Sequence, residues 1–387
     1  MHKRSYSKLL DKVPPSGIRK FFDLVMGQKG IISLGVGEPD FMTPWVIRER
    51  AIQVLEKGTT SYSSNQGIPE LCVSIQKYME KRFNCSYDPK TEMIITNGVS
   101  EGMDIVLRAL LNPGDDVLIP EPSYVCYSPL TVLTGANVVS VPTHDSDFVL
   151  DANVLESSIT KNSKVLILSS PSNPTGRIIP KEQLIEIAKV VVKHDLWVVS
   201  DEIYAELSFD DEYVSFASLP GMKERTLLLN GFSKAWAMTG WRLGYVCGPQ
   251  DVILRALKIH QYSALCAPTI SQFAGVVALD ETATEVEQMV QSYKERRNFM
   301  VKRFSDIDLF LPHPDGAFYC FPSIKSTGLT AEDFALGLLQ EHNVAVVPGT
   351  AFGQGGDGHI RCCYATSMKQ LEEALDKISK FVKKVRK

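Results

Sequence analysis

The chain has 387 residues, of which 44% are hydrophobic and 22% are charged, and its formal net charge is -4 at pH 7. This is the composition of an ordinary globular protein, and the length predicts two domains, or a large domain with a smaller one attached. Nothing in the sequence is basic enough to suggest nucleic acid, although the last segment, KKVRK (383–387), is positive, and no apolar run is long enough to span a bilayer. Neither nucleic acid nor a membrane is therefore expected as a partner. The positive first ten residues are followed by DKVPPSG instead of an apolar run, so no signal peptide is expected. The eight cysteines lie mostly in hydrophobic or strand-like segments without metal-type spacing, which favours reduced thiols and a cytoplasmic protein.

From residue 92 onward, apolar strand-like runs alternate with helical patterns. The expected strands cover 92–98, 117–120, 136–142, 164–170, 196–201, 226–230 and 243–248, and the expected helices cover 100–111 and 181–194. Strands that alternate with helices predict an α/β domain with a largely parallel sheet. The runs are apolar on both faces, as strands covered by helices on both sides must be.

The pattern changes near residue 284. A long charged helix is expected at 284–304, and a smaller α+β unit follows it. The expected strands of this unit cover 316–322, 344–349 and 359–365, and its expected helices cover 331–342 and 368–385. The chain therefore predicts a large α/β domain followed by a smaller α+β domain.

Polar residues follow four of the expected strands, at the edge where ligands bind in open α/β sheets. NGVSEG opens a helix after the first strand, and the free N–H groups of such a turn suit a phosphate. Asn173 stands in PSNPTG, Asp201 and Tyr204 stand in DEIY, and Ser233 precedes Lys234 in GFSK. Each residue alone could be an ordinary turn or capping residue, but the four groups together indicate a site.

This combination suits pyridoxal phosphate. The amine of Lys234 can form a Schiff base with an aldehyde cofactor. A buried carboxylate such as Asp201 keeps the ring nitrogen protonated, so that the ring acts as an electron sink. The remaining candidate contacts are Tyr204 and Asn173 to the ring oxygen, Tyr124 stacked on the ring, and Ser233, Arg242 and the turn at 98–101 to the phosphate.

Several segments resemble those of class I/II aminotransferases, which are fold-type I enzymes that use pyridoxal phosphate. They are GVGEPDF (35–41), TSYSSNQG (60–67), PSNPTG (171–176), SDEIY (200–204), GFSKAWAMTGWRLGY (231–245) and HIRCCYAT (359–366). The resemblance runs almost end to end and is strongest to aromatic and aspartate-type members. It implies a large domain over 46–283, with a mostly parallel seven-stranded sheet between helices, and a small domain over 284–387. An N-terminal segment, 1–45, would join the small domain and cover the site.

The resemblance also implies the role of each matching residue. Lys234 would carry the cofactor as a Schiff base and move the proton at the substrate Cα, with Asp201 and Tyr204 as the other catalytic residues. Arg361 would bind the α-carboxylate of the substrate. The implied cofactor contacts are Val99, Ser100, Tyr124, Asn173, Asp201, Tyr204, Ser233, Lys234 and Arg242, with Tyr62 reaching the phosphate of the neighbouring subunit in a homodimer that shares its sites. The implied substrate contacts besides Arg361 are Gly37, Asn173 and Ile18, and the peptide bond before Pro174 is expected to be cis.

We therefore expect an aminotransferase that moves the amino group of an L-amino acid, aromatic or aspartate, to a 2-oxo acid such as 2-oxoglutarate. Ser100 stands where some aspartate-using relatives have a lysine, and Arg19 is a candidate second cation that is more often solvated. One alternative is a lyase or another reaction on the same cofactor and fold. Another is a regulator without catalysis, although the short N-terminal segment leaves no room for the DNA-binding domain that such a regulator usually carries.

The segment GQGGDG (353–358) matches the dinucleotide-binding pattern G-x-G-x-x-G and would suggest a dehydrogenase. That pattern should open a helix, yet the residues that follow it are expected to form a strand. We therefore expect a glycine-rich loop near Arg361 that moves when substrate binds.

Overall fold

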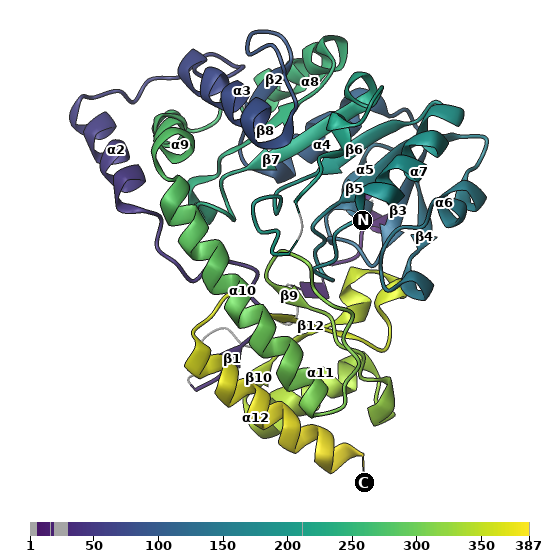
Figure 1. Cartoon of the computed structure of the whole chain (residues 1–387). Helices are drawn as coiled ribbons and strands as arrows, with labels where there is room; N and C mark the ends of the chain where they lie inside the picture. The colour runs from purple at the N-terminus through teal and green to yellow at the C-terminus, as the bar shows by residue number, and fades with distance from the viewer. Residues whose placement is uncertain (1–5, 16, 19–29, 211, 387) are drawn as a thin grey trace, which may run out of the picture.

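The computed structural model describes residues 6–15, 17–18, 30–210 and 212–386. Within them, the largest sheet has seven strands in the order β2-β8-β7-β6-β5-β3-β4 (Figure 1). These strands are β2 (Met93–Thr96), β3 (Asp116–Glu121), β4 (Asn137–Pro142), β5 (Ser163–Ser169), β6 (Trp197–Asp201), β7 (Thr226–Gly231) and β8 (Gly244–Cys247). Only β8 runs antiparallel to its neighbours. The expectation of an α/β protein with a mostly parallel sheet is confirmed.

Successive residues of the central strands enter two different apolar cores. Val165 and Ile167 of β5 pack with α4 (Val99–Leu110), α5 (Tyr127–Leu133) and α8 (Gln250–Ser263). Leu166 and Leu168 pack with α6 (Ala152–Ser158) and α7 (Lys181–Lys193) on the opposite face. Because strand side chains alternate between faces, this division shows a sheet covered on both sides, as the apolar runs predicted. The helices α2 (Trp45–Glu56), α3 (Pro69–Phe83) and α9 (Thr269–Glu281) flank the β2 end of the sheet (Figure 1).

The long helix α10 (Ala283–Asp306) leads from the sheet to a smaller unit (Figure 1). This unit contains α11 (Ala331–His342) and α12 (Met368–Val385), at the bounds that the sequence predicted. Its three-stranded sheet has the order β11 (Val347–Pro348), β12 (Ile360–Cys363), β9 (Tyr319–Cys320). A separate parallel pair joins β1 (Ile32–Ser33) from the N-terminal segment to β10 (Val344–Ala345).

Two strands of the smaller unit differ from the sequence prediction. The expected strand at 316–322 is reduced to β9, because Ala317 has a left-handed φ of 57° that interrupts the extended backbone. The expected strand at 344–349 divides into β10 and β11, which pair in different sheets. Its first half pairs with the N-terminal segment and its second half with β12, a division that no local pattern could reveal.

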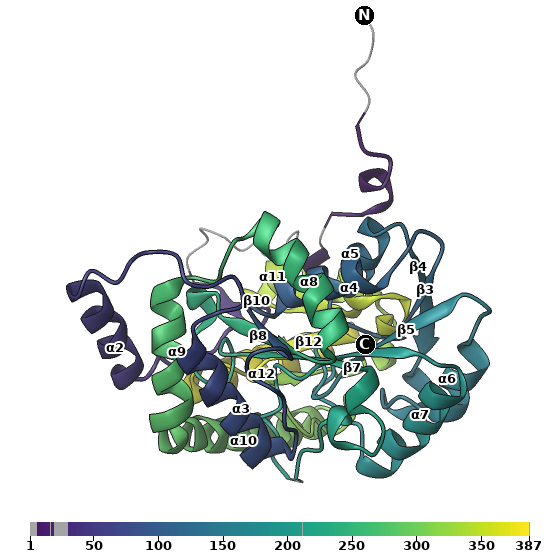
Figure 2. The same ribbon diagram turned by 90° about the horizontal axis from the view of Figure 1, so that it is seen from above.

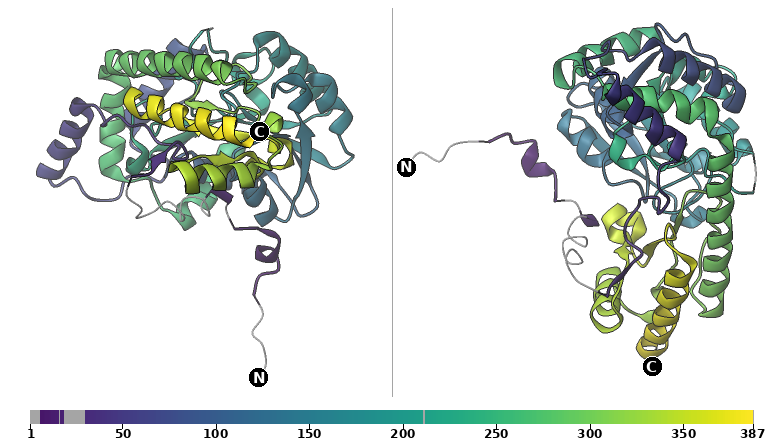
Figure 3. Two further views of the ribbon diagram at one scale, coloured as in Figure 1. Left: turned by 90° about the horizontal axis from the view of Figure 1, so that it is seen from below. Right: turned by 90° about the vertical axis from the view of Figure 1, so that its left-hand side faces the viewer.

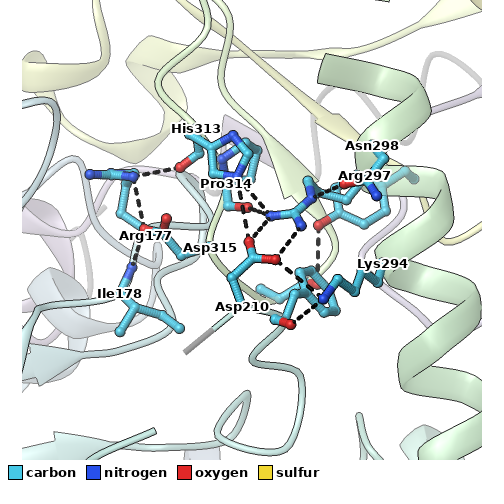
Figure 4. Close-up of polar contacts among 12 residues, drawn as sticks. Arg177, Ile178, Asp210, Lys294, Arg297, Asn298, His313, Pro314 and Asp315 are labelled. Carbon is cyan, nitrogen blue, oxygen red and sulfur yellow. Dashed lines mark hydrogen bonds and ion pairs between the residues drawn. The ribbon is translucent and has the colours of Figure 1, made fainter. Parts of the chain in front are cut away.

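An ion-pair network joins α10 to the segment after β6, and a neighbouring ion pair joins the segment after β5 to the chain before β9 (Figure 4). Arg297 is buried, and its guanidinium donates to both carboxylate oxygens of Asp210 at 2.7 and 3.0 Å and to the carbonyl of Pro314 at 2.7 Å. Beside it, Arg177 from the loop after β5 pairs with Asp315 at 2.8 Å. These contacts fix the edge of the sheet against the chain that leads into β9.

The N-terminal arm lies apart from the rest of the molecule. Residues 6–15 project from the body (Figures 2 and 3) and contain one 3-10 turn, Leu10–Lys12, with no buried residue. Among the helices described by the structure, none combines the length and the apolar character that crossing a bilayer requires.

Candidate active site

A cavity of about 500 Å³ lies where the parallel strands end, a size typical of pockets for small ligands. Every predicted site residue except Tyr62 lines it: Ile18, Gly37, Val99, Ser100, Tyr124, Asn173, Asp201, Tyr204, Ser233, Lys234, Arg242 and Arg361. Asn173, Asp201, Tyr204, Ser233 and Lys234 stand at or just after the carboxyl ends of β5, β6 and β7, which bring them to one edge of the sheet. Ile18 and Gly37 come from the N-terminal segment, and Arg361 comes from β12 of the smaller unit. Tyr62 lies outside the cavity, with 82% of its surface exposed. Arg19 falls outside the residues that the structure describes.

One end of the cavity is an anion cradle. Helix α4 begins at Val99 after Gly98, whose φ is 78°, and no side chain caps its first N–H groups. The guanidinium of Arg242 lies against this turn and donates to the carbonyl of Asn97 at 3.2 Å. Ser233 also lines the cavity. Free N–H groups at a helix N-terminus beside an arginine suit a phosphate.

Asp201 lies at the end of β6 and is buried. Its carboxylate accepts from the hydroxyl of Tyr127 at 2.7 Å and from the N–H of Ile203 at 3.3 Å. Burial raises the pKa of Asp201 to about 6, although the bond from Tyr127 opposes that shift. No arginine, lysine or histidine among the described residues forms an ion pair with it. A cationic ring nitrogen is the partner that such a carboxylate lacks.

Sequence reasoning missed Tyr127. The residue begins α5, three positions after Tyr124, and its ring is buried. The motif PEPSYV drew attention to Tyr124 alone, and nothing in the sequence connects residue 127 with residue 201.

Lys234 follows β7 and presents its amine to the cavity. The amine donates to the carbonyl of Gly37 at 2.8 Å and lies 5.8 Å from the ring centre of Tyr204. Burial lowers the pKa of Lys234 to about 8. The lowered pKa makes the neutral form, which a nucleophilic amine requires, more accessible near neutral pH than in an ordinary lysine.

Arg361 of β12 is a buried cation with only 2% of its surface exposed. It donates to Asn173 Oδ1 at 2.9 Å and to the carbonyl of Gly35 at 2.6 Å, while its Nε is buried without a partner. No carboxylate among the described residues pairs with it. A buried guanidinium with an unused donor suits a carboxylate that comes from a substrate. The Asn173–Pro174 bond beside it is cis, as expected.

Tyr204 meets a second tyrosine that the sequence analysis did not name. Its hydroxyl lies 2.8 Å from the hydroxyl of Tyr319 in β9. The ring of Tyr319 in turn lies 4.5 Å from the guanidinium carbon of Arg361. The run GAFYCFP predicted a strand here, and only the fold brings this strand to the cavity.

The glycine-rich segment 353–358 is a loop, as expected. It contains a single 3-10 turn, Gln354–Gly356, and leads into β12 instead of a helix, so the dinucleotide interpretation fails. Gly353 and Gly355 lie directly against Glu121. The ring of Phe352, just before the loop, lies 4.9 Å from the guanidinium carbon of Arg361. The movement of this loop on substrate binding stays a prediction.

The residues around the cavity fit pyridoxal phosphate. The cradle at α4 matches its phosphate, the uncompensated carboxylate of Asp201 matches its ring nitrogen, and the partly neutral amine of Lys234 matches its aldehyde. The volume of about 500 Å³ leaves room for a substrate beside it.

Comparisons with known proteins agree with this geometry. Residues 29–378 match the family model for aminotransferase class I and II. A putative aminotransferase of Bacillus subtilis is 50% identical over 379 residues, which cover 98% of each chain. An aspartate aminotransferase of Pyrococcus abyssi is 45% identical and aligns over 97% of this chain and 98% of its own length. The crystal structure of an aromatic aminotransferase from Pyrococcus horikoshii superimposes with a TM-score of 0.90 at 42% identity, over 95% of this chain and 99% of the other.

Proposed function

Because this chain belongs to the class I and II aminotransferases, which are fold-type I enzymes that use pyridoxal phosphate, we propose that it transfers the amino group of aspartate or an aromatic L-amino acid to 2-oxoglutarate. Transamination itself follows from the family and from relatives that match over nearly the full length. The observation that carries the proposal is Arg361, a buried cation with a spare donor beside the amine-bearing cavity.

The proposed cofactor contacts follow from the geometry of the cavity. The N–H groups of α4 at Val99 and Ser100, with Ser233 and Arg242, would hold the phosphate. Asp201 would bond the ring nitrogen, Tyr124 would stack on the ring, and Tyr204 would donate to the ring oxygen. Asn173 Oδ1 accepts from Arg361, and the amide N–H groups of Asn173 would be the donors that it offers to the cofactor and the substrate. When bound, pyridoxal phosphate supplies an electron sink that stabilises negative charge at the substrate Cα.

The protein itself would position the substrate and move the proton. Arg361 would hold the α-carboxylate in one orientation, through two donors of a planar group. The amine of Lys234 would attach the cofactor, and once released it would take the proton from Cα and return it during the exchange. The carbonyl of Gly37 accepts from that amine at 2.8 Å and would help to orient it in the cavity.

The donor preference rests on the side of the cavity that would meet the substrate side chain. Ile18, Val36 and Val125 contribute apolar atoms to the lining of the cavity. We propose that they meet the substrate side chain, which favours an aromatic donor among the candidates. Ser100 offers no cation, and an aspartate side chain would need a second cation to offset its desolvation.

We also propose a cytoplasmic homodimer with shared sites. Large hydrophobic side chains are exposed in this part of the chain, at Met42, Trp45 and Tyr62. Exposed hydrophobic side chains of this kind are expected where a second subunit covers them. All eight cysteines are free, which fits a reducing compartment.

The proposal is tested with the purified, cofactor-loaded protein. Single amino acids are added without a 2-oxo acid, and the visible absorption band of the cofactor is followed. We expect rapid loss of the band with phenylalanine, tyrosine or aspartate, and its return on addition of 2-oxoglutarate. A band that no amino acid changes would contradict transamination and favour the regulator. Stoichiometric release of ammonia would favour a lyase.

The variant Lys234→Ala separates binding from chemistry. We expect it to retain the cofactor through the phosphate contacts, while its turnover falls by about three orders of magnitude or more. The matched control is Lys223→Ala, because Lys223 pairs with Glu92 away from the cavity. Turnover of Lys234→Ala close to that of this control would contradict the proposed role of Lys234.

A further inference from the structure

Tyr319 is a buried polar residue of the cavity lining to which the proposed function assigns no role. Its hydroxyl lies 2.8 Å from the hydroxyl of Tyr204. On its other side is the Cα of Gly37, where the hydroxyl leaves no space for a side chain. Its ring is held beneath the guanidinium of Arg361, at 4.5 Å. The hydroxyl is therefore fixed at one place between three parts of the site.

The number of available protons decides the direction of the bond between the two tyrosines. Each phenol has one O–H donor and can also accept. If Tyr204 donates its proton to the ring oxygen of the cofactor, its own oxygen can only accept from Tyr319. We propose that Tyr319 is a positioning residue that donates to Tyr204 and thereby strengthens the bond from Tyr204 to the ring oxygen. This inference rests on the proposed function, because it takes Tyr204 as the donor to the cofactor.

Two physical effects follow from this arrangement. A hydroxyl that accepts a bond becomes a better donor, because successive hydrogen bonds polarise one another in a medium of low dielectric constant. The bond also fixes the rotation of the Tyr204 hydroxyl, which would otherwise be free to turn away from the cofactor. Tyr319 thus improves both the strength and the orientation of one donor without touching the cofactor's ring oxygen itself.

The two tyrosines belong to different parts of the molecule. Tyr204 follows β6 of the large sheet, whereas Tyr319 lies in β9, directly opposite Cys363 of β12. The strand β12 also carries Arg361. The hydrogen bond between the two tyrosines therefore connects two parts of the site. One is the β9–β12 strand pair, which carries Arg361, and the other is Tyr204, which would bind the cofactor ring.

The variant Tyr319→Phe tests the inference, because it removes the hydroxyl and keeps the ring under Arg361. The readout is the pH midpoint of the change in the visible spectrum of the bound cofactor, measured without substrate. A donor to the ring oxygen favours the form in which that oxygen carries more negative charge, so weakening the donor raises the midpoint. We expect an upward shift of about 0.3 to 1 pH unit and a cofactor dissociation constant raised about two- to tenfold. The charged and titratable groups facing the pair, namely Arg361, Lys234, Tyr124 and Cys363, are the same in both proteins.

Three further proteins make the result specific. Tyr204→Phe should raise the midpoint more than Tyr319→Phe, and the double variant should match Tyr204→Phe, because Tyr319 acts through Tyr204. The control Tyr364→Phe removes another buried hydroxyl, which donates to the carbonyl of Ala317 at 3.2 Å, and should leave the midpoint unchanged. Replacement of Tyr319 by 3-fluorotyrosine keeps the packing and makes the hydroxyl a stronger donor, so the midpoint should fall.

The outcomes separate this inference from the proposed function. A shift in Tyr204→Phe without a shift in Tyr319→Phe or with 3-fluorotyrosine would overturn the role of Tyr319 and leave the cofactor assignment intact. Shifts that add in the double variant would overturn the proposed route through Tyr204. No shift in any of these proteins would overturn the inference together with the assignment of Tyr204 to the ring oxygen.

Discussion

At the scale of single residues, the adjacent carboxylates Asp201 and Glu202 have different surroundings: one lines the cavity and the other is buried in the protein interior. The carboxylate of Asp201 lines the cavity, whereas Glu202 lies wholly buried behind the sheet edge. Ser200 and Ser215 donate to Glu202 Oε1 at 2.8 and 2.9 Å, but Oε2 has no partner among the described residues. Burial raises the pKa of Glu202 from 4.5 to about 7.

This shift predicts how Glu202→Gln changes stability with pH. The folded state holds the proton of Glu202 more tightly than the unfolded state, so its contribution to the stability falls as the pH rises from 4.5 to about 7. Glutamine cannot ionise, so we expect Glu202→Gln to raise the urea midpoint at pH 8 relative to the parent protein, with a gain in unfolding free energy on the order of 3 kcal/mol. At pH 5 the two proteins should differ little.

The control for this prediction is Glu206→Gln. The carboxylate of Glu206 accepts from Tyr78 at 2.6 Å and pairs with Arg82 at 3.2 Å, so removing its charge should give no gain at pH 8. Equal midpoint changes for Glu202→Gln at pH 5 and pH 8 would show that ionisation of Glu202 has no part in the stability.

At the scale of elements, the start of α4 depends on a glycine. Gly98 has a φ of 78°, and a Cβ there would lie 2.8 Å from Arg242 Nη2. Arg242 itself has a left-handed φ of 53° and donates to the carbonyl of Asn97. The anion cradle therefore depends on contacts between the turn at Gly98, the first residues of α4 and Arg242. A shift of any one of them would change the positions of the groups that face the anion.

We expect Gly98→Ala to weaken cofactor binding about tenfold or more, because the new methyl group must displace the Arg242 guanidinium that faces the phosphate. The control is Gly221→Ala, at a similar φ of 74° but with nothing within 4 Å of the added methyl group. It should cost about 1 kcal/mol of stability from backbone strain and leave the cofactor dissociation constant unchanged. Fluorescence titration of both variants with pyridoxal phosphate measures this, and equal dissociation constants would contradict the role given to Gly98.

At the scale of the whole molecule, the cavity lacks one predicted contact. Tyr62 is 82% exposed and lines no part of the cavity in its own chain. We propose that two chains associate through the surface that carries Tyr62, and that its hydroxyl then contacts the phosphate site of the partner. The dimer proposal therefore predicts that the exposed Tyr62 contributes to the affinity of the partner subunit for the cofactor.

We expect sedimentation to show a dimer at micromolar concentration. Tyr62→Phe should keep that dimer but raise the cofactor dissociation constant about three- to tenfold, since one hydrogen bond to a charged group is lost. Tyr262→Phe, at another tyrosine that is 88% exposed, serves as the control and should change neither quantity. A monomer in sedimentation, or equal dissociation constants for the two variants, would contradict the shared site.

Much of the fold could be read from the sequence because its signals are local. The apolar runs of β2 to β8 and the periodic patterns of α11 and α12 predicted those elements within a few residues. The division of the expected strand at 344–349 could not be predicted, because its first half pairs with β1 and its second half with β12, and β1 lies far away in the chain. A strand's partner is a property of the whole topology, which no window of neighbouring residues contains.

The family, the mostly parallel sheet and the polar residues at its edge could all be recognised from the sequence, because those polar residues directly follow apolar strands. The neighbours of those residues, in contrast, depend on the three-dimensional fold. Asp201 meets Tyr127 across 74 positions, Tyr204 meets Tyr319 across 115, and Arg361 meets the carbonyl of Gly35 across 326. Hydrogen bonds and burial act over a few ångströms in space, so the partners that shift a pKa or orient a donor are set by packing and not by order along the chain.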